Sequence, residues 1–410
     1  MKKFFFTAAL AALALTACNK SGSIPETPSP KAQLGFSIST AAMGETRAAP
    51  VGADEVQVNT VDAFIFNATG DLDAYGHYSS ADFTTTGGIT SLNNDKKLPC
   101  STGSGKTVWI VINGDDSNVT GGYASGIKTR AELESQVFLL SQNARGSGTK
   151  TLDNFQMIGS RTEQKFLPGD NLISVEVSRP VARVWIKQIT KNFASAAQAA
   201  ALTVKNIYMS NVVGSCRYDG VTKVAANDLW YNKYTPGAGG PSVTIDNAMN
   251  LWLNRNLAAA GVSIAEDASA TTEVESTFYV MPNNVPWGWN DDNNDSTADV
   301  FGPVGGDTWT PRHTNLVVET EYAGKTYYYC IPVAGNGATG YPIGKDSDNG
   351  STYEGLLANY SYEINELVLT RLGTTSPDEP VLPAMVKVNL TIKPWTAQLM
   401  ANNSSNQYVI

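Results

Sequence analysis

Apolar and polar residues alternate along much of this chain, a pattern that predicts β-strands. Near the start, Leu34, Phe36 and Ile38 alternate with Gly35 and Ser37. A period of two places the apolar side chains on one face of a half-buried strand, and we expect this segment to be the first strand of the fold. Further strands are predicted within residues 55–67, 107–113, 171–189, 202–213, 276–283, 314–333 and 360–372. Within residues 314–333, the run "YAGKT" between two alternating segments predicts a hairpin.

The clearest alternation lies almost at the C-terminus, in a predicted strand whose apolar face is Val386, Val388, Leu390 and Ile392. Pro394 cannot donate a hydrogen bond to a strand ladder, so we expect a bend there and a second extended piece from Trp395. Eleven residues follow Leu399. Little chain is therefore left to cover the edge of this last strand.

A helical pattern is rare in this sequence. Thr129 and Glu132 have the spacing of a capping box, and Leu133, Val137 and Leu140 fall on one helical face. This predicts a helix from Thr129 to Gln142. Short helices are also predicted at residues 193–201 and 247–257. Strands dominate, so the fold class is mainly β, with β-sandwiches and long loops.

The N-terminus is typical of an exported protein. Lys2 and Lys3 precede an apolar run at residues 4–15, which is too short to span a bilayer and is followed by "LTAC". These four residues resemble the lipobox of bacterial lipoproteins, which implies a signal peptide at residues 1–17 and a lipid anchor on Cys18. An ordinary signal peptide with an incidental cysteine is the alternative. Residues 19–30 are rich in Pro and Ser and predict a tether.

The charge balance excludes one class of partner. The formal net charge is −9 and the isoelectric point is about 4.9. Binding to nucleic acid requires a basic surface, so we expect no nucleic-acid partner. Beyond the N-terminus no apolar run of membrane-spanning length occurs, so any membrane attachment is expected to be through lipid.

The residues available for catalysis or cofactor binding are few. Cys100, Cys216 and Cys330 are odd in number, so at most one disulfide can form among them, and we interpret them as buried apolar side chains. His77 and His313 are the two histidines of the chain. Without a GxSxG or HExxH motif, we expect neither an enzyme nor a cofactor.

Two local motifs invite a chemical interpretation that the sequence supports weakly. The run "CSTGSGKT" at residues 100–107 resembles a phosphate loop, but it lacks the first glycine and leads into a predicted strand, so we interpret it as a hairpin turn. Oxygen-bearing side chains with the spacing of a calcium loop occur at Asp291, Asn293 and Asp295. Ser296 replaces the turn glycine of such a loop, and a solvated loop is the alternative.

Tryptophans near this acidic loop suggest a third possibility. Trp287 and Trp289 are two positions apart, so both rings could face one way in extended chain and stack on a sugar. Packing within or between domains is the alternative. A glycan-binding surface lipoprotein that uses these rings or Trp309 is therefore the second functional hypothesis.

Several segments together resemble the major fimbrilin family of Bacteroidales bacteria, the FimA and Mfa1 type pilins. They are the lipobox, "GETRAAP", "SRPVARVWI", "FYVMPN", "VVETEYAGKTYYYCIPV", "YSYEINELVL" and "VKVNLTIKPW". The resemblance spans nearly the whole chain. It implies two transthyretin-like β-sandwich domains, at residues 48–178 and 179–380, and a C-terminal donor-strand extension at residues 381–410.

The same resemblance implies how such subunits join. A protease with arginine or trypsin-like specificity would cut between Arg47 and Ala48, removing residues 18–47 as a propeptide that carries the first strand, Leu34, Phe36 and Ile38. An exposed arginine without cleavage is the alternative. A neighbour's tail, with Val386, Val388, Leu390, Ile392 and Trp395, would then fill the vacancy.

We therefore expect a structural subunit of a cell-surface fimbrium that supports adhesion or biofilm formation. Its expected location is the outer membrane as a lipoprotein precursor, and then the extracellular fimbrium. Its expected partners are other copies of itself, accessory anchor and tip subunits, and host or bacterial surface receptors. An anchor or tip role in the same fimbrium is an alternative to a stalk role.

Overall fold

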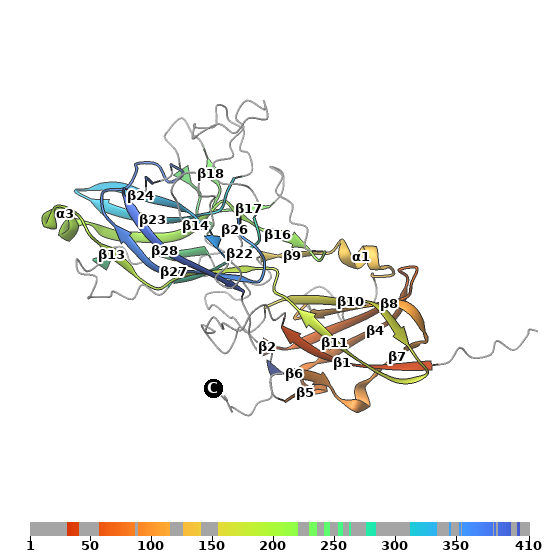
Figure 1. Ribbon diagram of the computed structural model, residues 1–410. Coiled ribbons are helices and arrows are strands. Elements are labelled where there is room, and N and C mark those ends of the chain that lie inside the picture. The colour runs from red at the N-terminus through yellow and green to blue at the C-terminus, as the bar shows by residue number, and fades with distance from the viewer. Residues whose placement is uncertain are drawn as a thin grey trace, which may run out of the picture.

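The structure is a computed structural model in which β-strands dominate (Figure 1), which confirms the predicted mainly β class. Among the residues that the structure describes, the helices are few and short. The residues that the structure describes are 31–40, 57–86, 89–114, 126–140, 155–219, 229–235, 242–246, 253–256, 262–263, 276–283, 312–333, 344–345, 352–353, 355–379, 381–382, 384–394 and 400–401.

The N-terminal half is built from two facing sheets. The first has the order β11-β1-β6-β5, with β7 also paired to β1, and the second has the order β10-β8-β3-β4. The strands of the first sheet are β1 Lys31–Thr40, β5 Phe83–Thr86, β6 Ile89–Leu92, β7 Leu98–Ser101 and β11 Gly169–Val177. Those of the second are β3 Thr60–Phe66, β4 Leu72–Ser79, β8 Gly103–Ile112 and β10 Met157–Phe166, and two 3-10 turns lie at η2 Ser80–Asp82 and η3 Asn94–Lys96.

Strands β3 and β8 of the second sheet are buried on both faces along most of their length, which explains their unbroken apolar runs. In β3, Ala63 and Ile65 face the core between the two sheets, whereas Phe64 and Phe66 face a second core on the other side. Strands covered on both faces are expected to read as continuous hydrophobic segments. The second core continues into the C-terminal half, so the two halves share buried apolar contacts.

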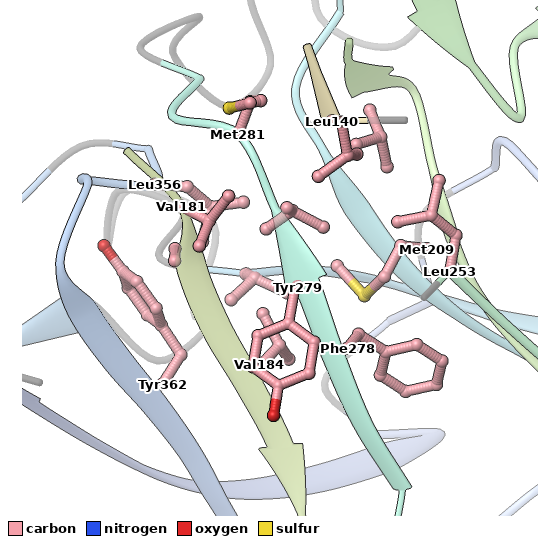
Figure 2. Close-up of a cluster of buried hydrophobic side chains, with 14 of the residues drawn as sticks. Leu140, Val181, Val184, Met209, Leu253, Phe278, Tyr279, Met281, Leu356 and Tyr362 are labelled. Atoms are coloured by element: carbon pink, nitrogen blue, oxygen red, sulfur yellow. The ribbon is translucent and has the colours of Figure 1, made fainter. Parts of the chain in front are cut away.

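The C-terminal half repeats the two-sheet plan. One sheet has the order β13-β27-β12-β22, with β28 on β27, and the other has the order β20-β14-β23-β24, with β21 on β14. Figure 2 shows Val184, Phe278 and Met209 from strands of both sheets within the buried cluster that joins them. The strands are β12 Ala182–Ile186, β13 Ile189–Lys191, β14 Thr203–Ser210, β20 Asn254–Asn256, β21 Val262–Ser263, β22 Ser276–Val280, β23 Asn315–Tyr322, β24 Lys325–Pro332, β27 Tyr360–Leu369 and β28 Val386–Pro394.

Short strands connect and decorate the two halves. β9 Val137–Leu139 pairs with β16 Ser215–Arg217, so a strand that precedes Ser178 pairs with one that follows it. The division of the chain at 178 stays a prediction. Four further two-stranded sheets are β2 Gln57–Val58 with β29 Met400–Ala401, β15 Val212–Val213 with β17 Trp230–Tyr231, β18 Tyr234–Thr235 with β19 Ser242–Val243, and β25 Gly344–Lys345 with β26 Thr352–Tyr353.

The helix predicted from Thr129 to Gln142 is wrong in length. Its capping box is present, because Thr129 accepts a hydrogen bond from the Glu132 amide and the Glu132 carboxylate accepts one from the Thr129 amide. The helix α1, Arg130–Glu134, then ends, since the following residues extend to pair with β16. Tertiary pairing overrides the helical spacing of Leu133, Val137 and Leu140.

The other two predicted helices have different outcomes. Helix α3, Ala196–Ala201, lies within the predicted residues 193–201, and the Ser195 side chain caps it. In the segment predicted at 247–257, Leu253 is helical and residues 254–256 form strand β20, whereas residues 247–252 and 257 lie outside the described residues.

One of the two predicted hairpins is confirmed and the other is wrong. Ala323 and Gly324 connect β23 to β24 with positive φ angles of 50° and 74°, as a tight hairpin requires. The turn of "CSTGSGKT" connects β7 to β8, but these strands belong to different sheets, so the predicted hairpin is in fact a crossing between layers. In the described part of the chain, no helix is long and apolar enough to cross a membrane.

Candidate functional site in the first and last strands

Strand β1 lies inside the first sheet with neighbours on both sides. On one side it pairs in parallel with β11, from Ala32 opposite Gly169 to Thr40 opposite Val177. On the other side it pairs antiparallel with β7 at its beginning and with β6 towards its end. Removing β1 would therefore expose backbone groups on both flanking edges.

The alternation seen in the sequence explains how β1 is held. Leu34, Phe36 and Ile38 are fully buried against the second sheet. The ring of Phe36 lies 5.8 Å from that of Tyr78 and 5.9 Å from that of Phe83, measured between centroids. At roughly 1.5–3 kcal/mol for each large apolar side chain, the three contribute about 5–9 kcal/mol. The first strand is thus an integral part of the core. Because it lies near the N-terminal end of the chain, one cut after it would separate it from the rest of the fold.

A buried ion pair lies beside the start of β1. The Nζ atom of Lys106 is 2.9 Å from the Asp73 carboxylate, and both groups are largely buried. Burial raises the pKa of Asp73, but hydrogen bonds from Ser101 and Lys106 outweigh it and leave the pKa below its ordinary value. Lys106 is the lysine of the phosphate-loop resemblance, and its contacts with Asp73 and Ser101 give it a structural role.

Cys100 also lies beside β1, on the neighbouring strand β7. Cys100 stands opposite Ala32 in the β1 and β7 ladder and is buried in the core between the sheets. Burial, reinforced by the nearby negative charge of Asp73, raises the pKa of Cys100 to about 11. Cys100, Cys216 and Cys330 are all buried, as the sequence predicted.

The predicted cleavage point follows β1 directly in the chain. β1 ends at Thr40 and β2 begins at Gln57, so Arg47 and Ala48 fall between them, in residues 41–56. These two residues lie outside the described residues. A cut there would leave β1 attached to the fold by noncovalent contacts alone.

Strand β28 is already placed in a sheet of its own chain. It pairs antiparallel with β27, from Val386 opposite Leu369 to Pro394 opposite Tyr360. Figure 1 shows the two strands side by side, and among the described strands β28 pairs with β27 alone. The strand predicted to be a donor is therefore an edge strand of the C-terminal half.

The apolar face of β28 is divided between core and surface. Val386 and Ile392 are buried, whereas Val388 and Leu390 are partly buried and pack against the same core. Burial of Val386 and Ile392 stabilises this arrangement by roughly 3–6 kcal/mol. Donation of β28 to a neighbour would have to offset this loss.

The extension continues past β28 towards the N-terminal half. Met400 and Ala401 form β29, which pairs in parallel with Gln57 and Val58 of β2. β29 also lies beside β5 and β6 of the sheet that contains β1. The extension beyond Pro394 therefore reaches the edge region of the first sheet within one chain.

Other predicted site residues lie outside the described residues. They are Cys18, Arg47, Ala48, Trp287, Trp289, Asp291, Asn293, Asp295, Trp309 and Trp395. The lipid anchor, the sugar contacts and the calcium loop therefore stay predictions. Within the described part of the chain, no group of three His, Cys, Asp or Glu side chains could hold a metal ion.

Sequence reasoning missed a buried ion pair in the C-terminal half. Arg312 pairs with Asp378, and both side chains are largely buried. Burial raises the pKa of Asp378 to about 6, although Arg312 and a hydrogen bond from Asn211 oppose the rise. The two partners are 66 positions apart, so no local pattern could have revealed the pair.

Comparisons with known proteins place this geometry in a family. A family model described as "Major fimbrial subunit protein (FimA)" matches residues 32–255, which is more than half of the chain. The chain is 24% identical to the major fimbrium subunit FimA type-4 of Porphyromonas gingivalis, over 96% of this chain and 98% of that protein.

Solved structures share the fold. The crystal structure of a fimbrilin from Porphyromonas gingivalis W83 has a TM-score of 0.59 and 18% identity, and the match covers 90% of this chain and 98% of that one. A crystal structure from Bacteroides eggerthii has a TM-score of 0.56 and 17% identity, over 90% of this chain and 98% of that one. With the match of the family model, these findings show that the chain belongs to the FimA family of major fimbrial subunit proteins.

Proposed function

We propose that this chain is a structural subunit of a cell-surface fimbrium and that it polymerises by exchange of strands between copies. The observation that carries the proposal is the position of β1. It fills the interior of a sheet and a core, yet a single cut in residues 41–56 would separate it from the rest of the chain. Membership of the major fimbrial subunit family supports the same function.

The sequence of events begins at the membrane. Cys18 carries the lipid anchor of the precursor, and residues 19–30 hold the folded part away from the outer membrane. While β1 stays in place, the first sheet is complete and offers no interior vacancy to a second chain. The precursor is therefore stored as a monomer.

Cleavage after Arg47 makes β1 replaceable. The segment "GETRAAP" has small residues on both sides of the arginine, which suits a protease site in an exposed loop. After the cut, β1 dissociates when its contacts, about 5–9 kcal/mol from the three large side chains, are exceeded by those of a competing strand. Its departure uncovers the edges of β11, β6 and β7 and an apolar floor.

The C-terminal extension of a second copy fills this vacancy. Val386, Val388, Leu390 and Ile392 supply an alternating face that matches that of β1, but their pairing with β27 opposes their release. Donation of residues 395–410 would not require β28 to leave β27. These residues include the apolar side chains of Trp395, Leu399 and Val409. The donor is therefore either β28, released from its sheet, or the extension beyond Pro394.

Either donor generates a fibre. The acceptor lies in the N-terminal half and the donor at the C-terminus, so each copy offers one of each, and the contact does not close on itself. Chains added in this way form an open filament at the cell surface. Such a filament supports adhesion to host or bacterial receptors and biofilm formation, with accessory subunits at the base and tip.

Limited trypsin treatment of the purified precursor tests this function. We expect the N-terminal segment to be removed and ladders of oligomers to appear on native gels. Arg47→Ala should prevent both changes. The matched control is Arg145→Ala, which removes an arginine from another segment with small residues on both sides and should leave the ladders intact. Cleaved wild-type protein that stays monomeric would overturn the proposal.

Two truncations identify the donor. Removal of residues 395–410 leaves β28 with its partner β27, and loss of the ladders would place the donor beyond Pro394. If the ladders persist, removal of residues 385–410 should abolish them and identify β28. Ladders that survive both truncations would contradict donation by the C-terminal extension.

A further inference from the structure

Three polar side chains meet beside the neighbouring strands β12 and β27 of the C-terminal half. Lys187 directly follows β12, and its backbone N–H donates to the Ile364 carbonyl at 3.0 Å. Its Nζ atom donates to Glu363 Oε2 and to Asn365 Oδ1, each at 2.8 Å. A lysine amine, a side-chain amide and a carboxylate are thus held together at a junction of neighbouring parallel strands.

The backbone positions the amide for this contact. The ladder between β27 and β28 has an irregularity between Ile364 and Glu366, and Asn365 is the extra residue there. A bulge of this kind redirects the side chain of its extra residue. The Asn365 Nδ2 group donates to Thr391 Oγ1 of β28 at 2.8 Å. This bond leaves the Oδ1 side of the amide turned to Lys187.

The surroundings limit access of water to the carboxylate. The Glu363 side chain is 2% exposed. The Trp185 ring lies on the same side of β12, with its centroid 4.6 Å from Lys187 Nζ. Arg183, fully buried, lies 3.9 Å from Glu363 Oε1, so the arginine faces the oxygen that the lysine does not contact. Charged groups are therefore arranged on both sides of one shielded carboxylate.

We propose that Lys187 and Asn365 condense into an intramolecular isopeptide bond, with Glu363 as the proton carrier. An ordinary ion pair requires the lysine and the glutamate alone. Here the amide carbonyl also lies within hydrogen-bond distance of the amine, so the Nζ atom is next to the carbon that it would attack. The proposal does not depend on the proposed function.

The reaction balances without an oxidant or a second reactant. The Lys187 ammonium first gives a proton to the Glu363 carboxylate, which produces a neutral amine and a neutral acid. The Nζ lone pair then forms a bond to Asn365 Cγ while the acid donates a hydrogen bond to Oδ1. Glu363 next gives its proton to Nδ2, the Cγ–Oδ1 double bond re-forms as the Cγ–Nδ2 bond breaks, and ammonia leaves. The Glu363 carboxylate then accepts the surplus proton from Nζ, which leaves a neutral amide.

The partial exposure of the lysine suits the last step. The Lys187 side chain is 33% exposed, so ammonia released beside it can reach solvent. The product would be a covalent bond between the end of β12 and the middle of β27. It would close a loop of nearly the whole C-terminal half, which restricts the unfolded chain and raises the unfolding temperature.

Mass spectrometry of the purified full-length chain tests the proposal. We expect a mass lower than that of the unlinked chain by one ammonia molecule, and a branched tryptic peptide that joins the segments containing Lys187 and Asn365. Lys187→Arg and Asn365→Ala should each restore the unlinked mass. Lys205→Arg is the control, because Lys205 is ion-paired with Glu321 at 3.4 Å and should leave the branched peptide intact.

The role of the carboxylate needs its own variant. Glu363→Gln keeps the size of the side chain and should prevent the bond, leaving unlinked peptides. If this variant forms the branched peptide as fully as the wild type, Glu363 is not the proton carrier. Wild-type protein that yields both peptides unlinked, with normal trypsin cleavage after Lys187, would overturn the proposal without reference to any variant.

Discussion

β1 stabilises the folded precursor, and we propose that its departure permits assembly. Substitution of Phe36 tests these two roles separately. The ring is fully buried and contacts Tyr78 and Phe83, so Phe36→Ala removes a large side chain from the core between the sheets. Such substitutions cost about 3–5 kcal/mol. In the uncleaved precursor this loss should lower the free energy of unfolding by that amount.

The same substitution should speed assembly. Once the chain is cut, β1 is held by its noncovalent contacts, and weakening them by about 3–5 kcal/mol raises its tendency to leave roughly a hundredfold to a few thousandfold. If departure of β1 limits the rate of polymer growth, that rate should also increase. The proposed polymer lacks β1, so the stability of mature subunits should not change.

The assay combines urea unfolding with polymerisation kinetics. Unfolding is measured with the Arg47→Ala precursor, with and without Phe36→Ala, and growth is followed by light scattering after trypsin is added to the cleavable pair. Leu172→Ala is the control, since Leu172 lies on β11 and is 79% exposed; its effect should stay within about 0.5 kcal/mol. A Phe36→Ala precursor that is destabilised but polymerises no faster would refute departure of β1 as the limiting step.

Three further predictions concern buried polar groups. Burial raises the pKa of Asp378 to about 6, above the ordinary value near 4, so the folded chain binds this proton more tightly than the unfolded chain does. The free energy of unfolding should therefore rise as pH falls from about 6 to about 4. Asp378→Asn should flatten that slope in urea titrations at several pH values. Lys106→Ala leaves the Asp73 carboxylate buried without its positively charged partner and should cost about 3–5 kcal/mol of unfolding free energy. Lys96→Ala, at an exposed ion pair, should leave the urea midpoint unchanged, and equal effects of the two substitutions would contradict the structural role of Lys106. Cys100 should resist maleimide in the precursor and react with it once β1 has left. The labelling is measured by mass, before and after trypsin treatment, on a variant without residues 385–410. Equal labelling before and after trypsin would show that β1 stays.

The strands were the part of the fold that the sequence predicted well. Alternation identified β1 and β28, and the "YAGKT" turn identified the hairpin of β23 and β24, because side-chain period and turn chemistry are local properties. The helix predicted from Thr129 failed for the opposite reason. Its residues after Glu134 pair with β16, and pairing between distant strands leaves no local signal.

The candidate site was predicted in part for the same reason. The sequence showed that β1 is apolar on one face, but its central place between β11 and β7 comes from pairing with residues more than 60 positions away. The pairing of β28 with β27 was not anticipated, because an alternating strand does not indicate which partner it takes. The cluster of Lys187, Glu363 and Asn365 likewise requires the register of two strands.

The central claim is that the tail of one copy replaces β1 of another. A mixture of two variants, each defective in one half of the exchange, tests it most directly. Arg47→Ala keeps β1 and can only donate its tail. A chain that lacks residues 385–410 and is cut after Arg47 can only accept a tail. Neither should assemble alone, and mixing them should give a dimer with one copy of each, with no longer products, in native mass spectrometry. Absence of the mixed dimer, or assembly of either chain alone, would contradict the claim.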